Sequence, residues 1–346
     1  MKVYRDIFTR IIDPETLFSA WDAFNSNKRN KRDVARFEWH LEENIFALHR
    51  ALRDKTYRHG RYEGFYVHDP KQRHIHKAPV RDRVLHHAIF SVINPIFEET
   101  FIPRSFSCRI GYGTHRGVDM LERVARRISR NGTADCFVLK CDVRKFFDSV
   151  DHDTLLSILA RRIKDDDAMW LLRQIIGSFS SPHAHLFERK GLPIGNLTSQ
   201  LFANVYLNEF DQFVKGVLRV GEYFRYTDDF AIVATDRAYL EWLIGPIADF
   251  LAGPLRLALH PKKVSIHRLH QGVDFLGYVI FPKHRVIRTK TRRRMIAKLA
   301  RRGTECRAGE ISELTLERSL QSYLGVLSHA NAHHLSESLK NGLWFN

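Results

Sequence analysis

The sequence predicts an α+β fold, and three observations lead to this prediction. Apolar residues recur at helical spacing over long stretches such as 37–52 and 84–96. Short apolar runs at 137–139 and 222–235 have the composition of buried strands. With 346 residues, of which 44% are hydrophobic and 27% charged, the chain can bury a large core, which excludes a mainly disordered protein.

In the first half of the chain, the apolar spacing predicts helices over residues 1–60, interrupted by a polar, basic segment at 25–32. A short strand pair is expected at 61–76. An amphipathic helix follows at 84–96, with Pro95 in its last turn. After a glycine turn at 111–113, the pattern predicts a helix over 118–128 and a buried strand that ends at Cys141-Asp142.

The second half continues the same mixture. Helices are predicted at 154–179, 199–217 and 238–252, and the C-terminal region is basic and helical. Strands or hairpins are predicted at 182–195, 222–235, 264–267 and 273–288.

The charge balance points to a polyanionic partner. Lys and Arg number 55 against 39 Asp and Glu, a net charge of +16, and nucleic acid is the first candidate. A merely soluble basic protein is the alternative. Four cysteines without C-x-x-C spacing predict reduced thiols and a cytoplasmic location, and charges within the first apolar patch argue against a secretory signal. No apolar stretch approaches the ~20 residues of a membrane span.

Two adjacent carboxylates, Asp228 and Asp229, lie between apolar runs that predict two strands and a tight turn. In an ordinary turn such residues are solvated or bond their own backbone. At the end of a buried hairpin they would repel each other, and a divalent cation would offset that cost. The dipeptide alone does not decide between these interpretations.

A second apolar strand, 137–141, also runs into a carboxylate, Asp142. One carboxylate from this strand beside the Asp pair would supply hard oxygen ligands for two Mg²⁺ ions ~3.5–4 Å apart, the arrangement used in nucleotidyl transfer. Asp148, farther along, need not share this role, and we expect it to cap the following helix.

Five ordered motifs resemble those of reverse transcriptases. Tyr226-Thr-Asp-Asp229 matches their Tyr-x-Asp-Asp box, and Asp142 to Asp148 resembles their first palm motif. The remaining three are similar to the third palm motif, the Asn-Pro-x-Lys stretch and the primer grip: 195–200, 260–263 and 275–278. The resemblance runs from about Arg73 to Tyr278.

This resemblance implies a right-hand polymerase fold with fingers, a palm of antiparallel sheet backed by helices, and a short helical thumb. The expected divisions are an N-terminal helical extension at 1–60, fingers at 61–136 with part of 150–192, palm at 137–285 and thumb at 286–346. The 68 residues after Tyr278 are expected to hold no RNase H, integrase or endonuclease domain. Residues 1–60 could bind structured template or an accessory protein.

The resemblance also implies roles for individual residues around the metals. Asp142, Asp228, Asp229 and the Val143 carbonyl are expected to hold two Mg²⁺ ions, with Mn²⁺ as an alternative, and Asp229 as the looser ligand. Phe147 matches the ring that blocks a ribose 2′-hydroxyl, so dNTPs are the expected substrates. Phe146, beside it, competes for this role.

Other residues are expected to contact nucleotide or nucleic acid. The segment whose cations hold the incoming triphosphate contains Arg73, Lys77, Arg81 and Arg83, and Arg73 and Arg81 are the favoured pair. A solvated basic face is the alternative for these cations. Lys263 could approach the pyrophosphate. The primer grip consists of Phe275, Leu276, Gly277 and Tyr278. In the thumb, Arg292, Arg293, Lys298 and Arg301 are expected on one helical face, along the template–primer backbone.

The third motif departs from the common Gln-Gly-x-x-x-Ser-Pro pattern. Ile194 stands where a glutamine precedes Gly195, and Gln200 replaces the proline. An aliphatic side chain cannot donate the usual hydrogen bond to the nucleotide, which is worth ~1–3 kcal/mol. This variant resembles the reverse transcriptases of diversity-generating retroelements.

That closer resemblance implies copying of a template-repeat RNA into cDNA, errors at template adenines, and a small basic pentameric accessory protein, in a prokaryotic cell or phage-infected host. A retron, group II intron-like or antiphage defence reverse transcriptase is the alternative. A non-catalytic RNA-binding scaffold is the alternative from another class, although it predicts a damaged Asp triad.

Overall fold

The computed structural model describes residues 2–69, 71–181 and 188–342, and they form two compact units. The first unit comprises Met1–Pro103, Asp142–Arg219 and Pro246–Lys262. The second comprises Arg104–Cys141, Val220–Gly245 and Lys263–Asn346. Each unit is assembled from three separate stretches, which explains why the sequence contains no linker between them.

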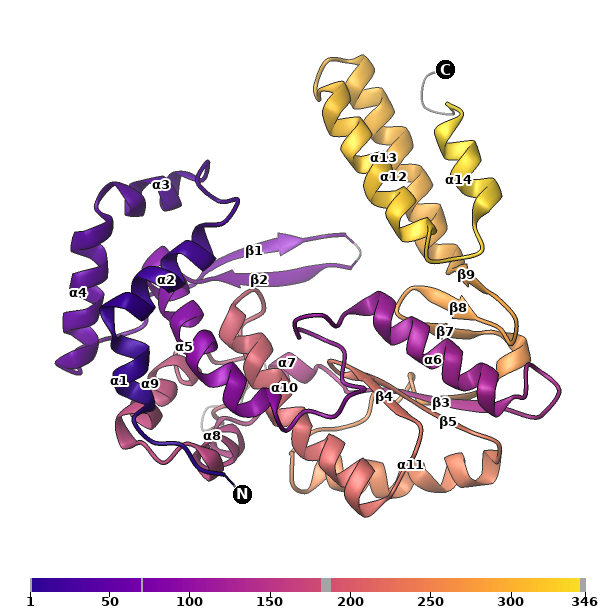
Figure 1. Ribbon diagram of the computed structural model, residues 1–346, viewed down its shortest axis with the longest axis horizontal. Helices are drawn as coiled ribbons and strands as arrows, with labels where there is room; N and C mark the ends of the chain where they lie inside the picture. The colour runs from indigo at the N-terminus through magenta and orange to yellow at the C-terminus, as the bar shows by residue number, and fades with distance from the viewer. Residues whose placement is uncertain (1, 70, 182–187, 343–346) are drawn as a thin grey trace. The chain divides into compact units, whose positions relative to one another are not determined.

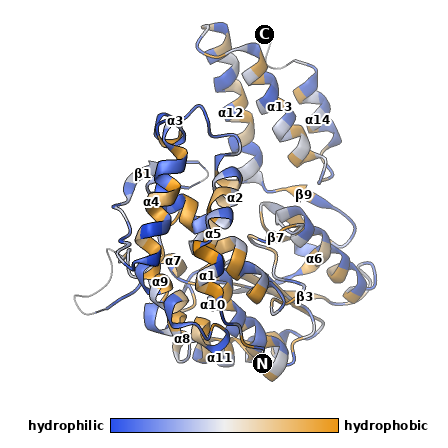
Figure 2. Cartoon of the chain, turned by 60° about the vertical axis from the view of Figure 1, so that its left-hand side comes forward, coloured by the Kyte–Doolittle hydropathy of each residue, from blue (hydrophilic) through white to orange (hydrophobic). Residues whose placement is uncertain are grey.

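The first unit is mainly helical (Figure 1). Its helices are α1 (Ile7–Ile12), α2 (Pro14–Asn25), α3 (Arg32–Trp39), α4 (Leu41–Arg53), α5 (Val80–Glu98), α7 (Phe146–Ser149), α8 (His152–Arg162), α9 (Asp166–Ile176) and α10 (Leu197–Gln212). Helix α5 packs against α2 and α10 because its apolar residues recur on one face, among them Leu85, Ile89 and Ile93, none of them exposed. Figure 2 shows the concentration of hydrophobic residues along α5.

An antiparallel hairpin completes the first unit. Strands β1 (Glu63–Val67) and β2 (Arg73–Lys77) pair in the register Glu63↔Lys77 to Val67↔Arg73. Every residue of β1 is exposed. Four of the five residues of β2 are half-buried, so the hairpin contacts the rest of the first unit through β2.

The second unit contains a four-stranded sheet in the order β4-β5-β3-β6. Its strands are β3 (Phe137–Asp142), β4 (Tyr223–Tyr226), β5 (Asp229–Ala234) and β6 (Ser265–Arg268). Helix α6 (Thr114–Ile128) packs on β4 and β5, and Leu121, Val138 and Phe224 belong to the core between them. Helix α11 (Arg237–Ala252) runs from this unit into the first.

A second sheet and three helices form the C-terminal part of this unit. Strands β7 (Val273–Phe275), β8 (Tyr278–Ile280) and β9 (Arg285–Ile287) are antiparallel neighbours. Helix α12 (Thr289–Arg307) packs on α13 (Glu313–Leu327), and α13 packs on α14 (His333–Lys340).

The structure confirms the predicted α+β class and most of the predicted elements. The helical residues 154–179 are divided between α8 and α9. Helix α10 continues as a π-helical turn over Phe213–Val217, and the hairpin predicted at 273–288 gains a third strand. The hairpin predicted at 182–195 lies partly outside the described residues. Of the helices that the structure describes, none combines the length and the apolar character needed to cross a membrane.

Candidate active site

The predicted carboxylates lie at one edge of the four-stranded sheet. Asp142 is the last residue of β3, Asp229 is the first of β5, and the two strands are neighbours. Burial and then the Asp229 carboxylate raise the pKa of the Cys141 thiol to about 12, so Asp229 lies close to the end of β3. The three Asp residues are each half-buried.

The turn between β4 and β5 is held in an unusual conformation. Tyr226 pairs with Asp229, so Thr227 and Asp228 form the connection. Thr227 has a φ of 53°, in the left-handed region that a β-branched residue rarely adopts. Such a conformation persists only where its surroundings hold it.

Two buried side chains provide that support. The Thr227 hydroxyl donates to Ser107 Oγ at 2.7 Å, and Arg225 Nη1 donates to the Thr227 carbonyl at 3.2 Å. Ser107 is 3% exposed and Arg225 is fully buried. Sequence reasoning missed both, although an arginine between Phe224 and Tyr226 in an apolar strand was a signal that it meets a polar partner.

The Val143 carbonyl points away from the chain segment that pairs with it. Val143 forms an isolated antiparallel bridge with Leu259. The hydrogen bonds around it run from His260 N to Asp142 O at 2.7 Å and from Arg144 N to Ala258 O at 2.8 Å. In such a pair the central residue's own N–H and C=O point away from the partner segment.

The donor set fits a hard divalent cation. Among the described residues, no three His, Cys, Asp or Glu side chains are grouped closely enough to hold a metal ion by themselves. Mg²⁺, however, is usually bound through one or two carboxylates together with waters and substrate phosphates, rather than in an all-protein cage. Carboxylates at the sheet edge suit that kind of site.

The two phenylalanines after Asp142 have different environments. Phe146 is 1% exposed and lies edge-on to Tyr206, with ring centroids 6.5 Å apart. Phe147 is half-buried and contacts Phe146 in a T-shaped pair. Phe146 is therefore a core residue, and Phe147 is the more exposed of the two rings.

The prediction that Asp148 caps the following helix was wrong. Asp148 lies within the short helix α7, and the cap of α8 is Asp151, whose carboxylate accepts from Thr154 N at 2.8 Å. A cap must immediately precede the first helical residue, here His152, which places Asp148 one turn too early.

The loop of the third motif lies against β2. His76 N donates to the Ile194 carbonyl at 2.9 Å, and Asn196 Nδ2 donates to the His76 carbonyl at 2.8 Å. Gly195 has a φ of +113°, and a Cβ there would lie 2.7 Å from Ile75 Cγ2. Only glycine fits this contact, so the glycine of the motif is required by the backbone. Ile194 is half-buried and Gln200 is exposed on α10.

The predicted triphosphate cations are not gathered at one point. Arg73 begins β2, whereas Arg81 lies beyond its other end, in α5. Arg81 Nη2 donates to the Arg58 carbonyl at 2.6 Å, and Lys77 Nζ lies 2.8 Å from Asp33 Oδ2. Lys77 and Arg81 thus already have protein partners, and Arg73 is exposed.

The predicted primer grip is a tight hairpin. Phe275 ends β7 and pairs with Tyr278, which begins β8. Leu276 and Gly277, with φ values of 49° and 93°, form a two-residue turn in which both central residues have positive φ. The Tyr278 hydroxyl donates to the Val326 carbonyl of α13 at 3.1 Å. Lys263 lies just before β6.

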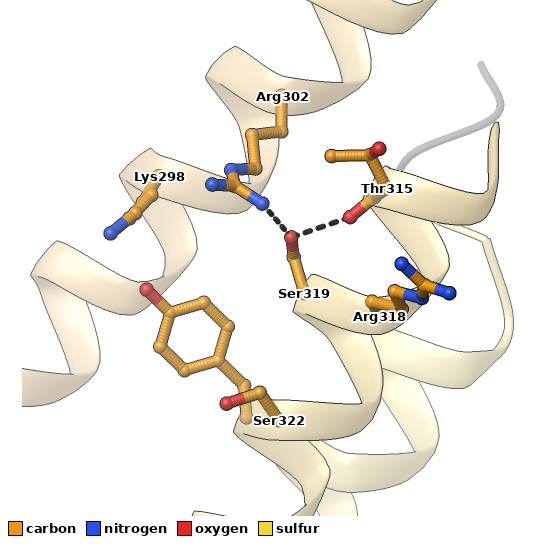
Figure 3. A pocket seen from close by; sticks show the side chains of 7 residues that line it. Lys298, Arg302, Thr315, Arg318, Ser319 and Ser322 are labelled. Atoms are coloured by element: carbon orange, nitrogen blue, oxygen red, sulfur yellow. Dashed lines mark hydrogen bonds between the residues drawn. The ribbon is translucent and has the colours of Figure 1, made fainter. Parts of the chain in front are cut away.

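The four cations that were predicted to lie on one face of the thumb helix do not share a face. Each residue turns an α-helix by about 100°, so Arg292 and Arg301 lie on opposite sides of α12. Lys298 instead lines a cavity of about 390 Å³ together with Arg302 and Arg318. Sequence reasoning did not predict a role for these two arginines. Figure 3 shows Arg302 and Ser319 pointing toward each other, and Ser319 Oγ donates to the Thr315 carbonyl at 2.7 Å.

Comparison with known proteins gives matches both to sequences and to solved structures. Protein YkfC of Escherichia coli is 28% identical, and the match covers 62% of this chain and 62% of YkfC. The group II intron-encoded protein LtrA of Lactococcus lactis is 22% identical, and the match covers 92% of this chain and 61% of LtrA. The chain thus spans less than two thirds of the length of these relatives. An apo telomerase structure from Candida tropicalis is 10% identical and covers 72% of this chain and 60% of its own, with a TM-score of 0.48.

The family model that matches is described as reverse transcriptase (RNA-dependent DNA polymerase), and it matches residues 68–280, more than half of the chain. This range includes all three predicted catalytic carboxylates, the Gly195 loop and the Phe275–Tyr278 turn. The chain therefore belongs to the reverse transcriptase family.

Proposed function

We propose that this chain is an RNA-directed DNA polymerase that extends a primer with dNTPs on an RNA template. The observation that carries the proposal is the placement of Asp142 and Asp229 on neighbouring strands at one sheet edge, with Asp228 in the adjoining turn. Two Mg²⁺ ions, or Mn²⁺, bound there would activate the primer 3′-hydroxyl and stabilise the departing pyrophosphate.

The chain's own residues would hold and select the nucleotide. Asp142, Asp228, Asp229 and the Val143 carbonyl are the proposed metal ligands, and Phe147 is the proposed barrier to a 2′-hydroxyl. Gly195 allows close approach of the backbone. The remaining proposed nucleotide contacts are Arg73, Lys77, Arg81, Ile194, Gln200 and Lys263.

The nucleic acid would be held by the C-terminal part of the chain. The Phe275–Tyr278 turn would position the primer end, and the α12–α13 cavity offers Lys298, Arg302 and Arg318 to backbone phosphates. Fingers at 61–136, palm at 137–285 and thumb at 286–346 remain the proposed divisions.

The test is RNA-templated primer extension by the full chain with Mg²⁺ or Mn²⁺. We expect dNTP incorporation that EDTA abolishes. RNA binding without incorporation in either metal would instead support the non-catalytic scaffold and overturn the proposal.

For the biological setting, we propose a diversity-generating retroelement, in which the enzyme copies a template-repeat RNA together with a small basic pentameric accessory protein in a prokaryotic cytoplasm. Ile194 and Gln200 support this proposal, because an aliphatic residue before Gly195 removes a polar contact to the nucleotide. The match to LtrA favours the second candidate, a group II intron-like enzyme.

Sequencing of cDNA made in vitro separates the two settings. A retroelement enzyme should misincorporate opposite template adenines, and Ile194→Gln should reduce those errors. Uniform low error at all four template bases would contradict the retroelement assignment and leave the polymerase proposal intact.

A further inference from the structure

The first turn of helix α6 contacts two hairpins of the second unit to which the polymerase proposal assigns roles. Thr114 Oγ1 donates to the hydroxyl of Tyr226, the last residue before the β4–β5 turn, at 3.4 Å. His115 Nδ1 lies 3.2 Å from the hydroxyl of Tyr278, which begins β8. One helical turn therefore connects the segment that carries two of the proposed metal ligands to the proposed primer grip.

The helix packs closely against the second of these hairpins. Gly117 is buried, and a Cβ added there would lie 3.2 Å from Leu276 Cδ1 and 3.3 Å from Phe106 Cγ. Leu276 is the first residue of the two-residue turn between β7 and β8. The lack of a side chain at position 117 therefore lets the backbone of α6 approach the turn of the primer grip.

The hydrogen bonds of Tyr278 run in one direction. The Tyr278 hydroxyl has a single proton, and the Val326 carbonyl, 3.1 Å away, can only accept, so this proton is donated to Val326. The phenolic oxygen then accepts from His115, which assigns a proton to His115 Nδ1. Two consecutive hydrogen bonds thus connect α6 through the primer grip to α13.

The His115 ring is itself held in place. It stacks on the ring of His329, which follows α13, with centroids 3.7 Å apart and an interplanar angle of 15°. Arg285 of β9 donates to the His329 carbonyl and pairs with Asp119 in the next turn of α6. Burial and then His329 lower the pKa of His115, so the ring is neutral at pH 7. A side chain fixed in this way is suited to orient another.

We propose that His115 is a positioning residue for the primer end, because its hydrogen bond to Tyr278 fixes the primer grip relative to the β4–β5 turn. The inference rests on the proposed polymerase function. The primer 3′-hydroxyl must lie within reach of metals at the sheet edge, and a displacement of about 1 Å can lower a rate roughly 100-fold. His115 acts through Tyr278 and is not assigned a contact with substrate or metal.

The test compares two substitutions of His115 in RNA-templated primer extension. Asparagine carries an amide nitrogen close to the position of Nδ1, so His115→Asn retains a donor for Tyr278, whereas His115→Leu does not. We expect His115→Leu to lower kcat roughly tenfold with an unchanged KM for dNTP, and His115→Asn to retain most of the activity. His333→Gln, on an exposed histidine of α14, is the control and should match the wild type.

Equal kcat values for His115→Leu and the wild type would overturn the proposal. An equal loss in His115→Asn and His115→Leu would overturn it as well, because the donor would then be irrelevant. Primer–template affinity, measured by fluorescence anisotropy, should be the same in all of these variants, since positioning affects the reacting end and not the number of phosphate contacts.

Tyr278→Phe tests the same hydrogen bond from its other end and leaves α6 unaltered. It removes only a hydroxyl and should also lower kcat roughly tenfold. In the Tyr278→Phe background, His115→Leu should cause less than about a twofold further loss, because the bond is already absent. Full activity of Tyr278→Phe, or a further tenfold loss in the double variant, would overturn the proposal.

The wild-type control separates this inference from the proposed function. Extension by the wild type that His115→Leu and Tyr278→Phe retain in full would overturn the role of His115 and leave the polymerase proposal intact. A wild-type protein that binds primer–template and does not extend it would overturn the polymerase proposal, and this inference with it.

Discussion

The β4–β5 turn and the α12–α13 helices are both proposed to act on nucleic acid, yet they are built differently. In the turn, the left-handed Thr227 is held by Ser107 and by the fully buried Arg225. Along α12, Arg292 and Arg293 are exposed, and Lys298 is half-buried. The turn therefore depends on a backbone conformation that neighbouring side chains hold in place, whereas the positive charge of α12 is spread over several residues.

This difference predicts different sensitivities to mutation. Metal chemistry depends on where a few oxygen atoms lie, so one substitution at the turn should have a large effect. Attraction to a phosphate backbone sums over many cations, so the loss of one should have a small effect. The predictions below, from the largest expected effect to the smallest, test this comparison.

Asp228→Asn should have the largest effect. It removes one carboxylate charge from the sheet edge, and the loss of metal stabilisation worth several kcal/mol should lower primer extension at least about 10³-fold. Single-nucleotide incorporation on an RNA template measures it. Asp236→Asn, in an exposed acidic residue after β5, is the control and should retain activity. Near-normal extension by Asp228→Asn would contradict the metal assignment.

Phe147→Ala and Phe146→Ala should separate selectivity from stability. Because Phe147 is half-buried, its loss should raise rNTP incorporation roughly 10- to 100-fold relative to dNTP. Because Phe146 is buried, its loss should cost about 3–5 kcal/mol of the free energy of unfolding. Competition between rNTP and dNTP measures the selectivity of Phe147→Ala, and urea denaturation measures the free energy of unfolding of Phe146→Ala. If Phe147→Ala left the sugar preference unchanged, another residue would have to exclude the 2′-hydroxyl.

Ser107→Ala removes the partner of the Thr227 hydroxyl without touching a carboxylate. Loss of one hydrogen bond should lower stability by about 1 kcal/mol. If Ser107 positions the turn, kcat should fall roughly tenfold while KM for dNTP stays constant, because the interaction supports the transition state rather than binding. A loss of stability with unchanged kcat would limit Ser107 to a structural role.

Lys298→Gln should have the smallest effect. The cavity retains Arg302 and Arg318, so affinity for a primer–template should fall only two- to threefold. The slope of the logarithm of the binding constant against the logarithm of the salt concentration should decrease in magnitude by about 0.7 to 0.9, the value for one phosphate contact. Lys340→Gln, in a residue of α14 paired with Glu337, is the control. A loss as large as that at Asp228 would contradict the contrast between the two regions.

Local sequence patterns were sufficient for most of the elements. The strand into Asp142, the hairpin around Asp228 and the α5 helix form where apolar periodicity and turn residues predict them. Errors came where the exact position of a residue along a helix matters. The cap of α8 is Asp151 and not Asp148, and the cations of α12 are spread around the helix because its 3.6-residue period separates neighbours.

By itself, the sequence determined the α+β class, and its motifs indicated the reverse transcriptase family, because both depend on residue order and short-range periodicity. Only the tertiary structure decided which phenylalanine is buried, that Ser107 and Arg225 support Thr227, and that His115 contacts Tyr278. These relations join residues up to 163 positions apart, as for His115 and Tyr278. No local pattern records such a contact, since burial and hydrogen bonding at long range arise from packing.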